Sequence, residues 1–180
     1  LDRNLRDGVR EETLALLRDL GTTALIVTHD PEEALSAGNR VALMNDGRIV
    51  QFDTGRAIYD RPVTRYAAEF FGTCNRMTAV CIDGQVTTPL GSFAARGIPD
   101  GPACVFVRPH AIRLVNEGAA PSATIIGVTL MGEVLQYLVS VSGVDAPVKI
   151  RTTDRPVPPM GTKVGLSVGP HGVFVFPGAA

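Results

Sequence analysis

The sequence has 180 residues, enough for one large domain or two small domains with real cores. Apolar residues make up 45% of it and charged residues 19%, a balance that excludes an intrinsically disordered chain. The formal net charge of −1 argues against a nucleic-acid binder, because phosphate backbones are normally bound by a basic face. No apolar stretch approaches the roughly 20 residues that span a bilayer, and no signal-peptide pattern opens the chain.

The cysteines exclude two further classes of small protein. Cys74, Cys81 and Cys104 are odd in number and lack CxxC spacing. A disulfide framework or a zinc site is therefore not expected, and the sequence favours reduced, structural thiols in a cytoplasmic protein.

The chain begins almost directly with a helical pattern. Over residues 3–20 the apolar side chains recur at helical spacing, and Gly21 follows as a stop signal. No strand precedes this helix. We interpret such a beginning as a piece cut from a longer protein.

A strand and a second helix are expected next. Residues 23–28 (TALIVT) form a continuous β-rich apolar run, typical of a strand covered on both faces of a sheet. After it, Asp30 is suited to cap a helix and Pro31 to its first position. Glu33 lies three residues after the cap, as in a capping box.

The first part of the chain ends in a hairpin and two short helices. Residues 40–55 (RVALMNDGRIVQFDTG) predict two strands joined around Asn45-Asp46-Gly47. Short helices are expected near 57–60 and over 64–71. This order of elements is typical of an α/β domain, but only of part of one.

After Gly72 the pattern becomes all-β. Residues 1–71 carry nine Arg against twelve acidic residues (−3), and residues 72–180 carry eight basic against six acidic residues (+2). Many short strands separated by turn residues predict a small barrel or sandwich. We therefore place a domain boundary near Gly72. The expected strands are 77–82, 86–88, 103–107, 111–115, 123–131, 133–141, 148–151, 163–168 and 172–176.

His29 is the main candidate for chemistry. It follows the expected strand 23–28, and ligands of open α/β sheets gather at the carboxyl ends of strands. A histidine there can donate a hydrogen bond to a phosphate oxygen and help to orient a water. Taken alone, Thr28-His29-Asp30 favours a histidine that only fills a strand-to-helix turn.

The surroundings of His29 favour the phosphate role. Leu1-Asp2, an amphipathic helix, the strand with His29 and Asp30, an acid-rich helix, and "RVALMNDGRIVQFDTG" occur in one order. Residues 1 to about 72 thereby resemble the last third of an ABC-transporter ATP-binding subunit. The resemblance implies that His29 is the switch histidine, which contacts the γ-phosphate of ATP. It also implies that Asp2 belongs to the D-loop, which links the two ATP sites of a closed dimer.

The same resemblance implies that the main ATP-binding motifs lie upstream of Leu1. The family's phosphate-binding loop, catalytic glutamate and LSGGQ signature are not in this sequence, and no G-x-x-x-x-G-K-S/T occurs anywhere in it. Without that backbone cradle and its lysine, the positioning of phosphate and Mg²⁺ is lost. We expect ATP and Mg²⁺ as cofactors of the intact parent protein only, and we expect this chain alone to be inactive.

The second part of the chain narrows the resemblance. "VFVRPHAIRLV" (105–115), "ATIIGVTLMGEVLQYLVSV" (123–141) and the closing "HGVFVFP" look like TOBE, the OB-like regulatory barrel of importer ATPases. The marks are Arg108-Pro109 between two strands, a long strand ending at Gly132, and a partner strand carrying Tyr137. Ferric iron, a polyamine or a phosphonate is the expected substrate.

Several other residues invite a functional role. Arg108 and Arg113 flank His110 and suggest an anion site, but solvated residues of the barrel surface are the simpler interpretation. Glu133 is expected in a turn, although a contact with a partner subunit is open. His110 and His171 lack a third ligand at metal spacing, so no metal is predicted. Tyr137, Phe174 and Phe176 are expected in the core or an interface; stacking of single-stranded nucleic acid is the alternative.

The sequence thus predicts an α/β fragment (residues 1–72) followed by an all-β OB-like barrel (73–180), α+β overall. The expected partners are a second copy, membrane-spanning permease subunits and, indirectly, a solute-binding protein, with no nucleic acid. The expected location is the cytoplasmic face of the cell membrane, bound peripherally.

One rival hypothesis is an oxyanion-binding regulatory module. Another is a self-sufficient enzyme using His29 with Asp30, which the absence of an activated Ser or Cys nucleophile disfavours.

Overall fold

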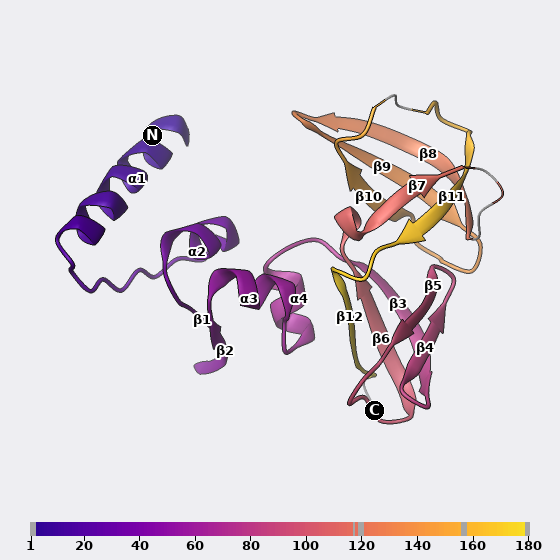
Figure 1. The fold of residues 1–180 in the computed structure, drawn as a ribbon, viewed down its shortest axis with the longest axis horizontal. Coiled ribbons are helices and arrows are strands. Elements are labelled where there is room, and N and C mark those ends of the chain that lie inside the picture. The colour runs from indigo at the N-terminus through magenta and orange to yellow at the C-terminus, as the bar shows by residue number, and fades with distance from the viewer. Residues whose placement is uncertain (1–2, 117, 119–120, 156–157, 179–180) are drawn as a thin grey trace. The chain divides into compact units, whose positions relative to one another are not determined.

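The computed structural model describes residues 3–116, 118, 121–155 and 158–178. The chain divides into two compact units, residues 1–58 and residues 59–180, which we name unit 1 and unit 2. Unit 1 carries helices and a hairpin, and unit 2 is mainly β (Figure 1). The predicted fold class, an α/β segment followed by an all-β OB-like barrel, is confirmed.

Unit 1 contains the elements that local sequence signals predicted. Its helices are α1 (Arg3–Asp19), α2 (Pro31–Ala37) and the first part of α3 (Gly55–Asp60). Strands β1 (Val41–Asn45) and β2 (Arg48–Asp53) form an antiparallel hairpin. Asp46 and Gly47 both have positive φ, 48° and 71°, as a two-residue type I′ turn requires.

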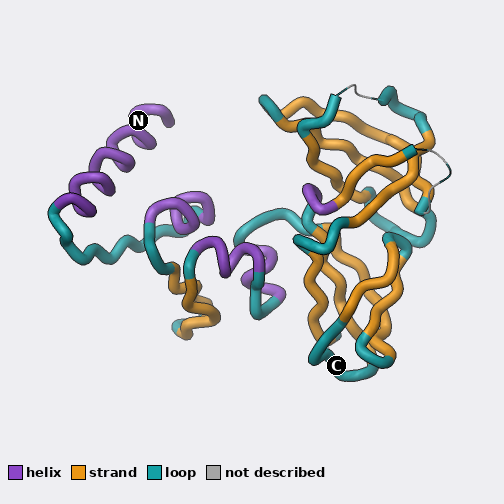
Figure 2. Tube along the Cα trace, in the orientation of Figure 1, coloured by secondary structure: helices purple, strands orange, loops and turns teal. Residues whose placement is uncertain are grey.

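The strand predicted over residues 23–28 is wrong. This segment runs from α1 to α2 without regular structure (teal in Figure 2), and Leu25 and Val27 are 92% and 90% exposed. A buried parallel strand needs neighbours that supply its hydrogen bonds. The other strands described in unit 1, β1 and β2, pair with each other, so the run has no ladder to join.

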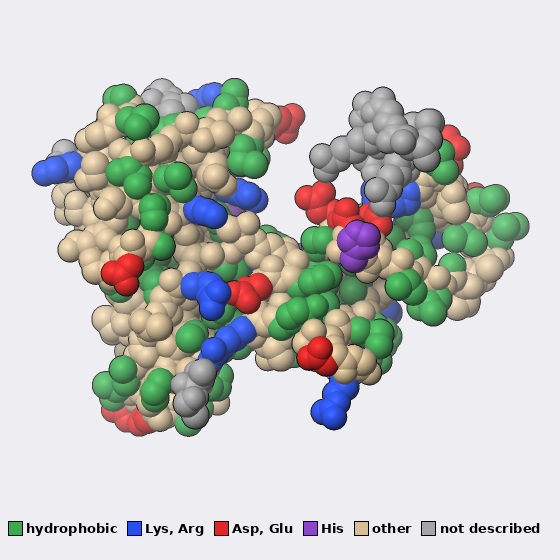
Figure 3. All heavy atoms as spheres, turned by 180° about the vertical axis from the view of Figure 1, so that it is seen from behind, with side chains coloured by type: hydrophobic (Ala, Val, Ile, Leu, Met, Phe, Trp, Pro, Cys, Tyr) green, Lys and Arg blue, Asp and Glu red, His purple; other side chains and the backbone are tan. Residues whose placement is uncertain are grey.

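The exposed apolar surface of unit 1 is broad (green in Figure 3). Val9 and Leu16 on α1 and Leu20 just after its end are each more than half exposed, although they follow the predicted helical spacing. The pattern therefore predicted the helix correctly, whereas the apolar stripe lies open in the part of the chain that is described.

Unit 2 holds two five-stranded antiparallel sheets. The first has the order β12-β6-β3-β4-β5, and the second β10-β9-β8-β11-β7. Helix α4 (Arg65–Phe70) precedes them, and the 3-10 helix η1 (Pro109–Ala111) lies between β6 and β7. The strands are β3 (Asn75–Ile82), β4 (Gln85–Thr88), β5 (Gly91–Ala94), β6 (Gly101–Val107), β7 (Ile112–Val115), β8 (Ser122–Met131), β9 (Val134–Val141), β10 (Val148–Thr152), β11 (Lys163–Val168) and β12 (Val173–Pro177).

All nine strands predicted for unit 2 are present among the described residues, with ends shifted by two residues at most, and one further strand was not predicted. The missed strand is β5, four residues that follow Pro89-Leu90 and pair with β4. Its sequence, GSFA, begins with a glycine and is too short to show alternation. Whether these four residues form a strand depends on the position of the pairing partner, β4. A local sequence pattern does not contain that position.

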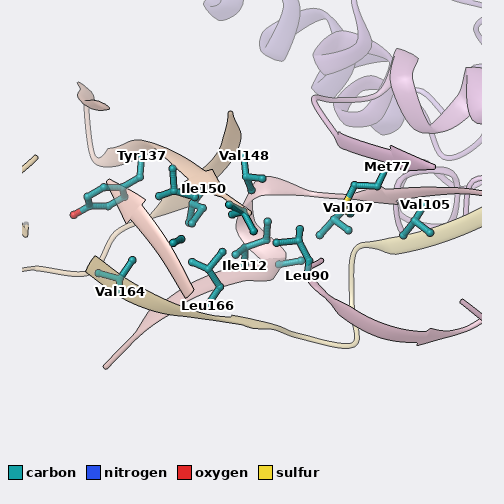
Figure 4. Packing of buried hydrophobic residues seen from close by; sticks show 14 of the residues in the cluster. Met77, Leu90, Val105, Val107, Ile112, Tyr137, Val148, Ile150, Val164 and Leu166 are labelled. Carbon is teal, nitrogen blue, oxygen red and sulfur yellow. The ribbon is translucent and has the colours of Figure 1, made fainter. Parts of the chain in front are cut away.

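One hydrophobic core connects the two sheets of unit 2. Met77 and Val105 from the first sheet and Tyr137, Ile150 and Leu166 from the second belong to the same buried cluster (Figure 4). Tyr137 is 1% exposed, so its predicted place in the core is confirmed. Alternation along β9, where every second side chain is buried, is what fills this space.

The opposite face of β6 carries a second, smaller cluster. Phe106 and Phe176 pack there edge to face, 5.4 Å between ring centroids, together with Ala68 of α4. Helix α4 thus packs onto the β-sheet and belongs to unit 2, although its composition resembles that of the first part of the chain. The domain boundary expected near Gly72 is not tested by this packing, and it stays a prediction.

A buried asparagine ties the first sheet to the edge of the second. The Asn75 side-chain amide donates to the carbonyls of Val107 (3.2 Å) and Lys149 (2.8 Å), and its Oδ1 accepts from the Lys149 N–H at 2.7 Å. Lys149 lies on β10, whose outer edge has no strand neighbour in the described sheet. Asn75 therefore supplies β10 with the backbone partner that an adjacent strand would otherwise provide.

We expect Asn75→Asp to destabilise unit 2 more than Asn75→Ala. A carboxylate loses both donors and places a charge against two carbonyl oxygens, whereas alanine only leaves the three backbone groups unpaired. A loss of about 1–3 kcal/mol in the free energy of unfolding is expected for alanine, measured by urea denaturation.

Asn116→Ala, at an exposed position of the same unit, is the matched control and should change the free energy of unfolding by less than about 0.5 kcal/mol. Equal stability of the Asn75→Ala and Asn116→Ala variants would contradict the role given to Asn75.

Candidate functional site

Three side chains define the turn that carries His29. Asp30 Oδ1 accepts from the backbone N–H groups of Glu32 (2.8 Å) and Glu33 (3.2 Å), which makes Asp30 the cap of α2. Pro31 occupies the first helical turn, as predicted. The helix start inferred from the sequence is therefore confirmed.

Thr28 completes this capping arrangement in a way that the sequence did not reveal. In a capping box Glu33 would bond directly to the Asp30 N–H. Here the Thr28 hydroxyl stands between them, accepting from the Asp30 N–H at 3.0 Å and donating to Glu33 Oε2 at 2.6 Å. The other Glu33 oxygen lies 3.7 Å from Arg10 Nη1, which links α1 to the same turn.

His29 lies at the apex of this turn with an exposed side chain. Among the described residues its imidazole has no hydrogen-bond, ion-pair or ring partner. Both residues beside it are held by hydrogen bonds, so the backbone is fixed while the ring remains available. The turn therefore leaves one imidazole exposed on unit 1.

The chemistry available at the turn is limited to what one imidazole provides. Each ring nitrogen can donate or accept one hydrogen bond. The neighbouring charges are carboxylates (Asp30, Glu32 and Glu33), which oppose an anion, and the first N–H groups of α2 are already capped by Asp30. Phosphate held here would need further donors or a cation.

The two other residues proposed for chemistry in unit 1 do not join His29. Asp2, the proposed D-loop residue, lies outside the described residues. Asp30 follows His29 in the chain, yet its carboxylate caps α2 and makes no hydrogen bond with the imidazole. The geometry therefore does not assemble the His29–Asp30 pair that a self-sufficient enzyme would require.

Arg108 of unit 2 corrects a sequence prediction. It was expected on the solvated barrel surface, but it is 1% exposed. Its Nη1 donates to the Gly72 carbonyl at 2.5 Å, while Nε and Nη2 are buried without a hydrogen-bond partner among the described residues. The guanidinium carbon lies 4.6 Å from the Tyr59 ring centroid and 5.5 Å from that of Phe174. Aromatic faces thus replace water around this cation.

Gly172 makes room for the buried arginine. Its φ is +87°, and a Cβ atom there would lie 3.1 Å from Arg108 Cβ. The Arg108 N–H also donates to the Gly172 carbonyl at 2.8 Å. Arg108-Pro109 and His171-Gly172, both noted as marks in the sequence, therefore belong to one packing site.

Arg108 also affects the thiol of Cys74. Burial raises the pKa of Cys74, and the nearby Arg108 charge opposes that rise. All three cysteines are free, as the odd count suggested.

The remaining sequence candidates lie apart from His29 in the chain and belong to unit 2. Arg113 and His171 are exposed, and Glu133 is exposed in the β8–β9 turn beside Gly132, whose φ is 68°. His110 stacks on Tyr59, with ring centroids 6.2 Å apart. Phe176 is buried and Phe174 half-buried in the β-sheet, as expected for core residues.

Within the described ranges, no three His, Cys, Asp or Glu side chains gather at metal-binding distance. Nor does any helix among these residues combine the length and the apolar character needed to cross a bilayer.

Comparison with known proteins identifies relatives across the whole chain. The TOBE domain family matches residues 105–176, which lie within unit 2. The Fe(3+) ions import ATP-binding protein FbpC of Escherichia coli is 33% identical over 184 residues, covering 100% of this chain and 52% of that protein. The spermidine/putrescine import ATP-binding protein PotA of Pseudomonas aeruginosa is 35% identical, over 77% of this chain and 43% of that protein.

Two further similarities extend over shorter parts of the chain. The sulfate/thiosulfate import ATP-binding protein CysA 2 of Chromobacterium violaceum is 43% identical over 126 residues, 68% of this chain and 34% of that protein. The molybdate-bound structure of the cytoplasmic protein ModG has a TM-score of 0.47 at 10% identity, over 58% of this chain and 96% of that one; this likeness is too weak to assign a ligand. The chain spans about half or less of the length of these curated relatives.

We expect Thr28→Val to loosen the turn that holds His29 while keeping its shape. The substitution removes the hydroxyl that accepts from Asp30 and donates to Glu33, at nearly constant volume. Amide hydrogen exchange at Asp30 and Glu33 should accelerate by about tenfold, the equivalent of one hydrogen bond.

Thr13→Val is the matched control. The Thr13 hydroxyl donates only within α1, to the Val9 carbonyl at 2.7 Å, so exchange at residues 30–33 should not change. Unchanged exchange at Asp30 in the Thr28→Val variant would show that the hydroxyl does not hold the turn.

Proposed function

Because the chain belongs to the ABC-importer ATP-binding subunits that carry a TOBE domain, we propose that it supplies their switch-histidine segment and regulatory barrel. Similarity to importer subunits along the whole chain supports the assignment of both parts. The observation that carries the proposal is the free imidazole of His29, presented by a turn whose backbone is hydrogen-bonded on both sides.

In this proposal His29 contributes one contact to a larger site. Its imidazole donates to the γ-phosphate of ATP and orients the attacking water, and Asp2 belongs to the D-loop that links the two ATP sites of the closed dimer. The phosphate cradle, ATP and Mg²⁺ are held by other segments, because this sequence has no G-x-x-x-x-G-K-S/T. The acidic residues beside His29 are consistent with this proposal. Their carboxylates repel a phosphate group, so other segments must bind its negative charge.

The partners follow from the same family membership. The working assembly is a homodimer of the complete subunit, bound at the cytoplasmic face of the membrane to permease subunits that receive solute from a binding protein. Ferric iron or a polyamine is the proposed substrate class, as in the names of FbpC and PotA, which match 100% and 77% of this chain.

The test is ATP turnover by a chimera in which this chain replaces the matching 52% of E. coli FbpC. We expect His29→Ala in the chimera to lower the rate of ATP hydrolysis by about 100-fold or more, because a group that contacts the transferred phosphate stabilises the transition state. ATP binding should change little, since the phosphate cradle is intact.

His171→Ala, at an exposed histidine of unit 2, should leave the rate of ATP hydrolysis unchanged. The isolated 180-residue chain serves as the blank and should not hydrolyse Mg-ATP. If the His29→Ala chimera keeps more than half the rate of the parent chimera, His29 is not the switch histidine.

A further inference from the structure

A basic pocket lies on unit 2, at the seam where its second sheet does not close. Strands β7 and β10 are the two edges of that sheet, and no ladder joins them. The sheet curls so that β10 lies next to both η1 and β7. The pocket opens at this seam with a volume of about 490 Å³, within the usual range for small-molecule sites.

Three cationic or protonatable side chains line the pocket and only one carboxylate does. Arg113 comes from β7, Arg151 from β10 and His110 from η1, whereas Asp154 is the acidic member. Neither arginine forms an ion pair with any described residue. Arg151 uses its Nε to donate to Gln136 Oε1 at 3.3 Å, which leaves both terminal nitrogens available.

The backbone adds further donors at the same edge. The Lys149 N–H and carbonyl turn outward to Asn75, so the two-residue period of a strand turns the Arg151 N–H to the same unpaired edge of β10. Thr152 Oγ1 accepts from the Asp154 N–H at 3.0 Å, which fixes the loop that follows. Donors from three elements therefore converge on a rigid rim.

The other wall of the pocket is apolar. The half-buried Val134 forms the accessible part of this side, whereas Ile112, which also lines the pocket, is only 1% exposed. A bare tetrahedral oxyanion would occupy only a small part of such a volume and would leave the apolar wall unused. The combination of guanidinium groups with aliphatic side chains suits a molecule that has both a charged and a nonpolar part.

We propose that this pocket binds a small organic anion, with its carboxylate or phosphate group on Arg113 and Arg151 and its nonpolar part on Val134. Such a ligand would make the barrel a metabolite sensor. This inference is independent of the ATPase role, because none of the pocket residues belongs to unit 1.

The charges around His110 predict how binding depends on pH. Desolvation against neighbouring side chains holds the pKa of His110 below its ordinary 6.5, Arg108 and Arg151 lower it further, and Asp60 opposes them. The Tyr59 ring stacks on the imidazole without charge. A bound anion favours the protonated ring, so it raises the pKa of His110, and affinity should increase as the pH falls toward that pKa.

Calorimetric titration of the 180-residue chain tests the proposal, with phenylacetate as the carboxylate probe and phenyl phosphate as the phosphate probe. At least one should bind saturably with a Kd below about 1 mM at low salt. Inorganic phosphate should bind at least tenfold more weakly than phenyl phosphate. Arg151→Gln and Arg113→Gln should each weaken binding tenfold or more, because each removes a charge-assisted contact.

Arg96→Gln, at an exposed arginine outside the pocket, is the control for general charge effects. Nuclear magnetic resonance provides a second readout: the probe that binds should raise the pKa of His110 and should leave the ring resonances of His171 unshifted. The proposal is overturned if neither organic probe binds below 10 mM, if inorganic phosphate binds as tightly, or if Arg96→Gln weakens binding as much as Arg151→Gln.

Discussion

Unit 2 depends on the positive charge of Arg108, which is buried without a counterion among the described residues. Arg108 lies at the end of β6, and its guanidinium contacts the Gly72 carbonyl, the Tyr59 ring and the Phe174 ring, which come from three separate parts of unit 2. Removing a guanidinium from water costs several kcal/mol, and an unpaired N–H group adds to that cost. Only one of its nitrogens makes a short hydrogen bond, so packing and cation–π contacts must offset the rest. An arginine that unites three segments in this way explains why Gly172 must lack a side chain.

Asn75 solves a related problem at the same end of β6, where it pairs with Val107. A curled sheet that does not close leaves two edge strands with unpaired backbone groups, and Asn75 satisfies those of Lys149 on one edge. Farther along the same strand, the edge has no such partner and the pocket opens beside Arg151. The unclosed seam therefore serves two purposes: one stretch of β10 joins the two sheets, and the next stretch presents donors to a ligand.

Local signals predicted most of the secondary structure. Asp46-Gly47 fixes its own turn, Asp30-Pro31 begins its own helix, and alternation of apolar residues shows the strands of the barrel, since all three are properties of adjacent residues. The failures involve residues that depend on distant partners. Residues 23–28 have the composition of a strand but no described strand beside them, and β5 is recognisable only once β4 lies next to it.

The candidate functional residues also divide into those that a local sequence signal identifies and those that depend on distant partners. His29 could be singled out because its turn is encoded within six residues, although the bridging hydroxyl of Thr28 was not foreseen. Arg108 and Arg113 read alike in the sequence, yet one is buried and the other exposed, because the difference depends on Tyr59, Phe174 and Gly172 far along the chain. Arg151 could not be singled out from the sequence, because His110 and Arg113, which line the same pocket, lie about 40 residues earlier in the chain.

The two units also differ in how much of their structure they determine themselves. Unit 2 encloses a continuous core between two sheets and satisfies its buried backbone through its own side chains, so its pocket is formed before any ligand arrives. Unit 1 orders the His29 turn through short-range hydrogen bonds while its apolar side chains remain open. A histidine held in this way is positioned locally but needs further groups for chemistry, because one imidazole cannot supply both phosphate binding and water activation. The proposed sensing can therefore be complete within the barrel, whereas the proposed catalytic role of His29 requires a phosphate-binding loop, which this sequence lacks.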